Sequence, residues 1–145
     1  MVTLKKITQD NLEEVLALDI KDEQKKYVSS TSVALAQAYV YSDTAYPFAI
    51  YADETVVGLI MMGYYEAKDY YTLWKFLIDS KYQNKGYGRK ALELGIKFLK
   101  DEHSAKEIYT GVILGNAVAK RLYESAGFKS TGLVEDGMEE MCLEL

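Results

Sequence analysis

The spacing of apolar side chains changes along the chain, and each change marks an element. Leu4–Ile7 reads as a short strand. Apolar positions then recur every three or four residues, first after Thr8–Asp10 as far as Asp19, and again from the Ser29–Ser32 cluster up to Tyr39. The first third of the chain therefore predicts one strand followed by two short helices.

In the middle of the chain, the pattern of residues is typical of β-strands. Phe48–Ala52 and Thr55–Tyr65 are rich in β-branched and aromatic residues, and only Asp53 and Glu54 separate them, which predicts a β-hairpin. Tyr70–Ile78 is apolar at nearly every position of its second half, with Lys75 as the exception. Such a run predicts a central strand that is covered on both faces.

The last third alternates again. Apolar stripes predict a helix after Gly88 that contains Leu92 and Leu99, and a second helix from the capping residue Asn116 to Gly127. A strand, Ile108–Ile113, lies between them, and Phe128–Val134 and Met138–Leu145 form a closing hairpin. The predicted order is βααβββαβαββ, which indicates one α/β (α+β) domain over residues 1–145 with a mixed sheet.

Composition agrees with an ordinary folded domain. The 145 residues are 49% hydrophobic and 27% charged, which excludes a disordered or low-complexity chain. Cys142 is the single cysteine, so no intramolecular disulfide is expected and a cytoplasmic location is the default. The sequence shows no signal-peptide pattern and no apolar run near the roughly 20 residues of a membrane span, so no membrane association is expected.

The charge is unevenly distributed. Asp and Glu outnumber Lys and Arg by 22 to 17, and the net charge of −5 argues against a nucleic-acid partner. Residues 81–100 nevertheless contain six basic residues against one acid, Glu93, which is a local charge of +5 and leaves −10 for the rest. This positive stretch indicates an anionic ligand at that segment.

The segment Gln83–Arg89 lies between a predicted buried strand and the start of a helix. Gly86 and Gly88 allow the backbone to approach a ligand closely, and the first amides of a helix favour an anion. The three-glycine dinucleotide fingerprint and the Walker loop are both missing. On glycine spacing alone, a turn with solvated lysines explains the segment equally well. Its coincidence with the positive stretch favours a polyphosphate ligand.

Two ordered blocks carry a family resemblance. Ile78–Gly88 resembles the pattern of a strand, a loop and Gln-x-x-Gly-x-Gly that opens a helix, and Asn116–Phe128 resembles Asn-x-x-Ala-x-x-Leu-Tyr-x-x-x-Gly-Phe. Both are signatures of the GNAT superfamily of acetyl-CoA-dependent N-acetyltransferases. Softer similarities point within it to the bacterial spermine/spermidine acetyltransferases, namely Gln24–Tyr27, Ala38–Tyr39, Val57–Gly58 and Gly137–Glu139.

The resemblance implies a three-layer fold with splayed central strands and helices on both faces of the sheet. It implies acetyl-CoA as co-substrate, no metal, and a small-molecule amine as acceptor; a homodimer stays open. The residues that it assigns to acetyl-CoA are Phe76, Ile78, Gln83, Asn84, Lys85, Gly86, Tyr87, Gly88, Arg89, Asn116 and Lys120.

Tyr123 is the general acid that the resemblance implies. The chemistry supports this role, because attack of an amine on a thioester releases a thiolate that needs a proton, and a tyrosine with an ordinary pKa near 10 is protonated at neutral pH. The alternative is that Tyr123 is a core residue, since it lies on the apolar stripe of its helix.

The base and the acceptor are less defined. Trp74 stands where some polyamine acetyltransferases carry a carboxylate, so Glu66, Asp69 or a water chain is left as the base. Glu23, Tyr27 and Glu66 are the expected acceptor-binding residues, although the charged segment 19–26 can equally be a solvated connection. A polyamine is the expected acceptor. The alternatives are another amine (a peptide N-terminus, a lysine or an amino sugar) and a non-catalytic acyl-CoA sensor.

Overall fold

A computed structural model describes residues 1–145, and it places seven strands in one sheet of order β1-β2-β3-β4-β5-β7-β6. All neighbouring strands are antiparallel except β4 and β5, which are parallel. The strands are β1 (Val2–Lys6), β2 (Ala45–Ala52), β3 (Thr55–Tyr65), β4 (Tyr70–Ile78), β5 (Glu107–Ile113), β6 (Lys129–Glu135) and β7 (Met138–Glu144). With the helices below, the predicted order βααβββαβαββ is confirmed.

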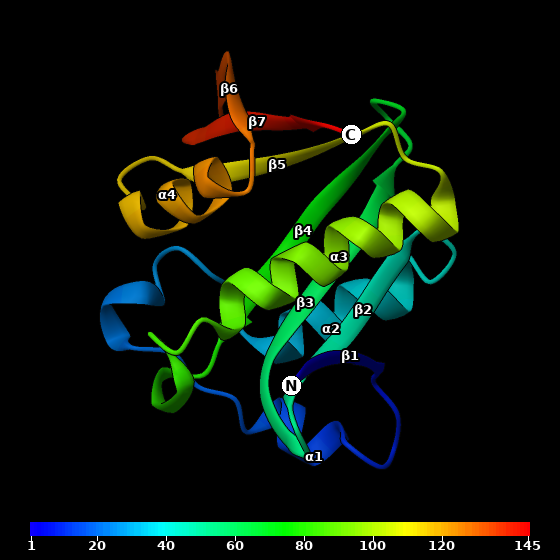
Figure 1. Ribbon diagram of the computed structural model, residues 1–145, viewed down its shortest axis with the longest axis vertical. Coiled ribbons are helices and arrows are strands. Elements are labelled where there is room, and N and C mark those ends of the chain that lie inside the picture. Colours follow the sequence, from blue (N-terminus) through cyan, green and yellow to red (C-terminus); the bar gives the residue numbers. More distant parts are fainter.

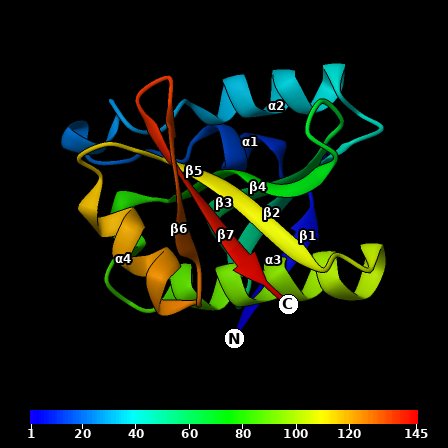
Figure 2. The same cartoon turned by 90° about the horizontal axis from the view of Figure 1, so that it is seen from above.

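The helices cover both faces of the sheet (Figures 1 and 2), as a three-layer fold requires. One core cluster, which includes Ile60 and Leu92, lies on the α3 side, and a second, which includes Val15 and Leu59, lies on the α1 and α2 side. The helices are α1 (Leu12–Leu16), α2 (Thr31–Val40), α3 (Tyr87–His103) and α4 (Ala117–Ser125), with 3-10 turns at Asp22–Gln24 and Ser80–Tyr82. No helix in the structure has both the length and the apolar character that crossing a membrane would need.

Gly95 allows α3 to lie directly on the sheet. A Cβ atom at this position would lie 3.0 Å from Sδ of Met62 and 3.1 Å from Cδ1 of Ile60, both on β3. These distances are shorter than ordinary van der Waals contact. The absence of a side chain at Gly95 therefore allows a close contact between α3 and β3.

The first helix is shorter than the periodicity predicted. Apolar spacing extended it to Asp19, but α1 ends at Leu16. The backbone N–H of Asp19 instead donates to the carboxylate of Asp79 at 3.0 Å, and Asp79 is 2% exposed. This buried hydrogen bond draws the chain after α1 toward the end of β4, which helical continuation would not allow.

The centre of the sheet opens between β4 and β5 (Figure 1). These strands pair only at Tyr71–Leu73 of β4, and the last pair joins Leu73 to Thr110. Immediately after it, the register of β4 against β3 shifts around Trp74. The second half of β4 is therefore paired on its β3 side only, and the predicted splayed central strands are confirmed.

Candidate functional site

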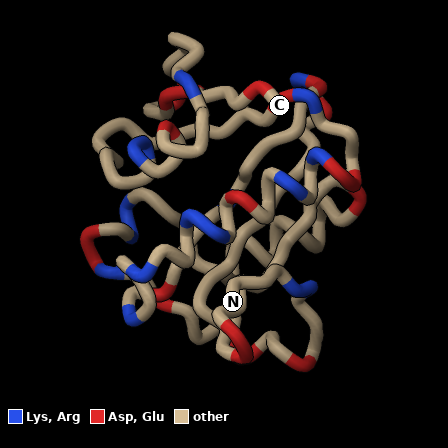
Figure 3. Tube along the Cα trace, viewed as in Figure 1, with Lys and Arg blue, Asp and Glu red and all other residues tan.

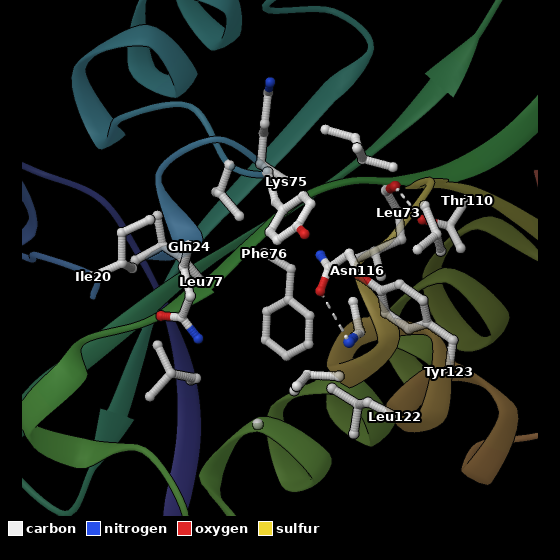
Figure 4. A pocket seen from close by; sticks show the side chains of 18 of the residues that line it. Ile20, Gln24, Leu73, Lys75, Phe76, Leu77, Thr110, Asn116, Leu122 and Tyr123 are labelled. Atoms are coloured by element: carbon white, nitrogen blue, oxygen red, sulfur yellow. Dashed lines mark hydrogen bonds between the residues drawn. The ribbon is translucent and has the colours of Figure 1, made fainter. Parts of the chain in front are cut away.

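A cavity of about 430 Å³ lies where β4 and β5 separate (Figure 4), and we call it the inter-strand cavity. Its walls are the second half of β4, the end of β5, the loop before α3, the start of α4 and the segment before α2. Lys75 and Arg89 are the only charged side chains in these walls, and neither Asp nor Glu is among them. The cavity is thus mostly apolar with a weakly positive character.

The predicted phosphate loop forms one end of this cavity. Asn84 and Gly86 both have positive φ, 62° and 82°, and Gly86 is the N-cap of α3 with no side-chain hydrogen bond to the first helical amides. Alternation of right- and left-handed backbone turns successive N–H groups toward one side, and the helix dipole adds positive potential there. The loop therefore has the geometry of an anion site.

Side-chain hydrogen bonds fix the predicted phosphate loop to the neighbouring segments of the chain. Nε2 of Gln83 donates to the carbonyl of Ile78 at 2.9 Å and to Oε1 of Gln24 at 2.9 Å. The buried Asp79 carboxylate accepts from the N–H of Lys81 at 2.9 Å as well as from Asp19. These contacts join the end of β4 to the segment before α2.

Of the residues predicted for the cofactor, nine line the inter-strand cavity: Phe76, Ile78, Gln83, Asn84, Gly86, Tyr87, Gly88, Arg89 and Asn116. Arg89 is also held in place, because its guanidinium donates to Glu93 at 3.2 Å and to Oγ of Ser125, in α4, at 2.9 Å. Side chains of Phe76 and Asn116 lie around the same space, one from β4 and one from the start of α4 (Figure 4).

The other two predicted residues, Lys85 and Lys120, lie outside its walls. Lys85 is an exposed loop residue. Nζ of Lys120 forms an ion pair of 2.8 Å with Glu139 on β7, and this contact raises the pKa of Lys120. The structure thus places Lys120 in a bridge between α4 and the closing hairpin.

Tyr123 faces the inter-strand cavity from α4. Its side chain is 8% exposed, and Asn116 caps the same helix two turns earlier by accepting from the N–H of Ala119 at 3.4 Å. Burial raises the pKa of Tyr123 to about 12. The phenol therefore holds its proton throughout the physiological pH range.

A second cavity, of about 690 Å³, lies on the other side of the strand separation, and we call it the acidic groove. It contains four carboxylates and one lysine, and its remaining walls are rich in aromatic rings. The carboxylates are Glu66, Glu135, Asp136 and Glu140, the lysine is Lys68, and the aromatic residues are Tyr41, Tyr64, Tyr65, Tyr70 and Trp74.

The two cavities meet at the point where β4 and β5 part. Both are lined by Leu73, Trp74, Thr110, Gly111 and Met138. Positive charge concentrates along α3 and the loop before it, whereas negative charge occurs on the β6–β7 hairpin (Figure 3). An anionic ligand in one cavity and a cationic ligand in the other would therefore meet end to end.

Charged contacts cross the mouth of the acidic groove. Nζ of Lys68, in the loop between β3 and β4, lies 3.9 Å from Glu135 and 4.0 Å from Glu140 on the β6–β7 hairpin. The other carboxylate oxygen of Glu140 accepts from the hydroxyl of Thr131 at 2.9 Å. The side chain of Glu140 is 19% exposed and that of Glu135 is 61% exposed, so Glu140 is the more buried of the two acids that pair with Lys68.

The predicted acceptor residues are not gathered in one place. Glu66 lines the acidic groove. Tyr27 instead lines the inter-strand cavity, where its hydroxyl donates to the carbonyl of Gly115 at 3.3 Å, and Glu23 lies in the 3-10 turn outside both cavities. The other three groove carboxylates were missed. The acidic turn at Glu135–Asp136 was the signal for two of them, and Glu140 lies on β7; strand order brings all three to the groove.

Comparison with known proteins agrees with this geometry. The model of the acetyltransferase (GNAT) family matches residues 12–128. The spermine/spermidine N(1)-acetyltransferase of Bacillus subtilis is 32% identical over 99% of both chains. Two crystal structures share the fold over nearly all of both chains. Spermidine N-acetyltransferase from Vibrio cholerae in complex with CoA and spermine has a TM-score of 0.76, 20% identity and coverage of 99% of this chain and 95% of that one. PaiA N-acetyltransferase from Thermoplasma acidophilum in complex with coenzyme A has a TM-score of 0.74, 17% identity and coverage of 100% and 99%.

The loop geometry generates a test of the anion site. Gly86→Val should weaken acetyl-CoA binding at least about tenfold, because a β-branched residue at φ 82° forces the loop out of its left-handed turn. Gly132→Val is the matched control, since Gly132 has φ 88°, open space around it and a position outside the inter-strand cavity. Isothermal titration with acetyl-CoA measures both. Equal loss of affinity in the two variants would contradict an anion site at Gly86.

Proposed function

Because this chain belongs to the acetyltransferase (GNAT) family, we propose that it transfers an acetyl group from acetyl-CoA to a primary amine of a polyamine such as spermine or spermidine. The observation that carries the proposal is the meeting of two cavities of opposite charge at the separation of β4 and β5. The 32% identity to a spermine/spermidine acetyltransferase over 99% of both chains supports the same acceptor class.

The residues around the inter-strand cavity fit acetyl-CoA. In this proposal the amides of the 83–88 loop and the start of α3 bind the pyrophosphate, with Arg89 beside them and the exposed Lys85 within reach of the phosphates. The unpaired edge of β4 at Phe76 and Ile78 offers backbone groups to the amides of pantetheine, and Asn116 faces them from α4. Lys120 is left at the rim, because Glu139 neutralises it.

Tyr123 is the proposed general acid. The amine nitrogen attacks the thioester carbon, the carbon–sulfur bond breaks, and the electron pair leaves with sulfur as a thiolate. Tyr123 donates its phenolic proton to this thiolate, which is a group with an ordinary pKa near 8.5 when protonated. A phenol whose pKa is raised to about 12 is fully protonated before this step, so the acid is always in the required form.

The acidic groove is the proposed acceptor site. A polyamine carries several ammonium groups joined by methylene segments, so its site needs carboxylates for the charges and aromatic rings for the methylenes. The groove has both. Trp74, which stands where some polyamine acetyltransferases carry a carboxylate, packs edge-on against Tyr41 with ring centroids 5.8 Å apart. The Trp74 ring gives the acidic groove an apolar wall where the groove meets the inter-strand cavity.

Proton removal from the incoming ammonium involves the groove carboxylates or water that they hold. Glu66 lines the groove. The Asp69 carboxylate accepts a hydrogen bond from the hydroxyl of Tyr64, and Asp69 is not in the groove wall. Of the two carboxylates that the sequence left as candidates, this placement favours Glu66.

The acceptor class is tested by a panel of amines. We expect CoA release with acetyl-CoA and spermidine or spermine to exceed the release with a lysine peptide, a peptide N-terminus or an aminoglycoside by at least about tenfold in kcat/KM, because only the linear polycations match the groove. Release of CoA with thiol detection measures this directly. Turnover confined to another amine would overturn the acceptor, and binding of acetyl-CoA without any turnover would favour a sensor.

Replacement of the proposed acid gives a second test. Tyr123→Phe should lower kcat about 100-fold and leave acetyl-CoA affinity unchanged, because only the phenolic hydroxyl group, and with it the transferable proton, is removed. In the wild-type enzyme, kcat should not fall between about pH 8 and pH 10 from ionisation of Tyr123, since a raised pKa keeps the protonated form present up to the folded-state value. Unchanged kcat in the variant would remove Tyr123 as the acid.

Charge in the groove gives a third test, with changes of opposite sign. Glu140→Gln should raise the KM for spermidine about fivefold because it removes an enclosed negative charge, whereas Lys68→Met should lower this KM because it removes the only cation. Steady-state kinetics at low ionic strength measures both. Lys100→Met is the control, since Lys100 is an exposed residue on α3 outside the groove. A KM that falls equally in the two lysine variants would indicate a general charge effect.

A further inference from the structure

Lys75 is a half-buried lysine without a carboxylate partner. It lines the inter-strand cavity, whose walls contain neither Asp nor Glu, and none of the ion pairs of the structure includes it. Its amine has one hydrogen bond, in which Nζ donates to Oγ of Ser29 at 2.9 Å. Burial lowers the pKa of Lys75, so its neutral, nucleophilic form is more populated than in a solvated lysine.

A bulge in β4 directs this side chain. The register shift against β3 leaves Trp74 as an extra residue between the paired positions Leu73 and Lys75. A bulge interrupts the strict alternation of side chains along a strand. Trp74 packs against Tyr41 at the end of α2. Lys75 reaches Ser29 just before α2, so two successive side chains lie on the α2 side of the sheet.

The position of Lys75 along β4 matches the reactive end of acetyl-CoA in the proposed complex. The 83–88 loop binds pyrophosphate there, and pantetheine extends along the unpaired edge of β4 past Ile78 and Phe76. The thioester follows at the next position toward the strand separation, in the cavity that Tyr123 also lines. Lys75 and Phe76 lie on opposite sides of β4 (Figure 4). The Lys75 side chain therefore starts at the level of the thioester, on the α2 side.

We propose that Lys75 is a site of self-acetylation, which takes the acetyl group of bound acetyl-CoA when no acceptor amine is present. The inference rests on the proposed binding of acetyl-CoA in the inter-strand cavity. The neutral amine donates one N–H to Ser29 and directs its lone pair at the thioester carbon. The carbon–nitrogen bond forms, and the carbon–sulfur bond breaks with its electron pair on sulfur. The nitrogen loses one proton to water and the thiolate gains one, so the products are acetylated Lys75 and CoA.

Acetylation of Lys75 changes the cavity in two respects. It removes one of the two cations in the walls, which leaves Arg89 alone. It also places an acetyl amide where the acetyl group of the cofactor would lie, so the modified protein turns over slowly. A polyamine in the acidic groove competes with Lys75 for the same acetyl group. The modification thus couples activity to the supply of acceptor.

Peptide mass spectrometry of the wild-type protein tests the site. With acetyl-CoA and no amine, Lys75 should be acetylated at least about tenfold faster than Lys100, because its amine is held beside the bound thioester. Lys100 is an exposed residue of α3 outside both cavities and reports on direct chemical acetylation. Excess CoA, or spermidine, should slow acetylation of Lys75 at least about fivefold, and CoA should leave Lys100 unaffected.

Activity after incubation tests the consequence. Wild-type protein that is incubated with acetyl-CoA and then desalted should acetylate spermidine at least about fivefold more slowly than fresh protein. Lys75→Arg should keep its own starting rate, because a guanidinium stays protonated and is not acetylated. Lys75→Met replaces it if the arginine variant does not fold. A loss that persists in the variant would overturn the link between modification and activity.

The outcomes separate this inference from the proposed function. Equal rates at Lys75 and Lys100, or a Lys75 rate that excess CoA leaves unchanged, would overturn self-acetylation, while spermidine turnover by fresh protein would still support the proposed function. Rapid acetylation of Lys75 without any spermidine turnover would support self-acetylation and overturn the polyamine acceptor. Failure to bind acetyl-CoA would overturn both.

Discussion

The separation of β4 from β5 is the constraint on which the rest of the structure depends. Three residue pairs hold these parallel strands together, and after Leu73 and Thr110 the backbones part. If β4 and β5 paired along their whole length, the inter-strand cavity would be closed and β4 would have no unpaired edge. The separation starts in the middle of the sheet at the Leu73–Thr110 pair, which we call the apex. On one side of the apex the inter-strand cavity extends to the loop before α3, and on the other side lies the acidic groove.

An open sheet needs polar anchors in place of the lost ladder. Asp79 and Gln83 fix the far end of β4 to the chain before α2, and Arg89 joins the start of α3 to the end of α4 through Ser125. At the apex, the hydroxyl of Thr110 reaches the carbonyl of Leu73. Of these anchors Asp79 and Thr110 are buried, and buried polar groups with satisfied partners specify one arrangement more sharply than apolar contacts do. The width of the opening is therefore set by directional bonds at its two ends.

Local patterns allowed much of the fold, and most of the residues that line the inter-strand cavity on its loop and α4 sides, to be predicted. The loop 83–89 and the helix from Asn116 are contiguous segments, so their motifs place Gly86, Asn116 and Tyr123 without knowledge of distant contacts. The acidic groove is different, because Glu66 and Glu140 come from elements 74 residues apart that only the strand order brings together. The partner of Lys120 was missed for the same reason: Glu139 becomes its neighbour only when β7 pairs with β5.

Opposite charge in the two cavities also changes the meaning of the net charge of −5. Exposed charges are screened within about 8 Å at physiological ionic strength, so the overall acidity of the chain has little influence on a ligand inside a cavity. What a ligand meets is the local set: Lys75 and Arg89 without any carboxylate on one side of the apex, and four carboxylates with one lysine on the other. Acetyl-CoA and a polyamine, the substrates of the proposed reaction, carry opposite charges. Two cavities of opposite sign that share only the residues around Thr110 would keep such ligands apart except at one meeting point, and the proposed acid, Tyr123, lines the inter-strand cavity.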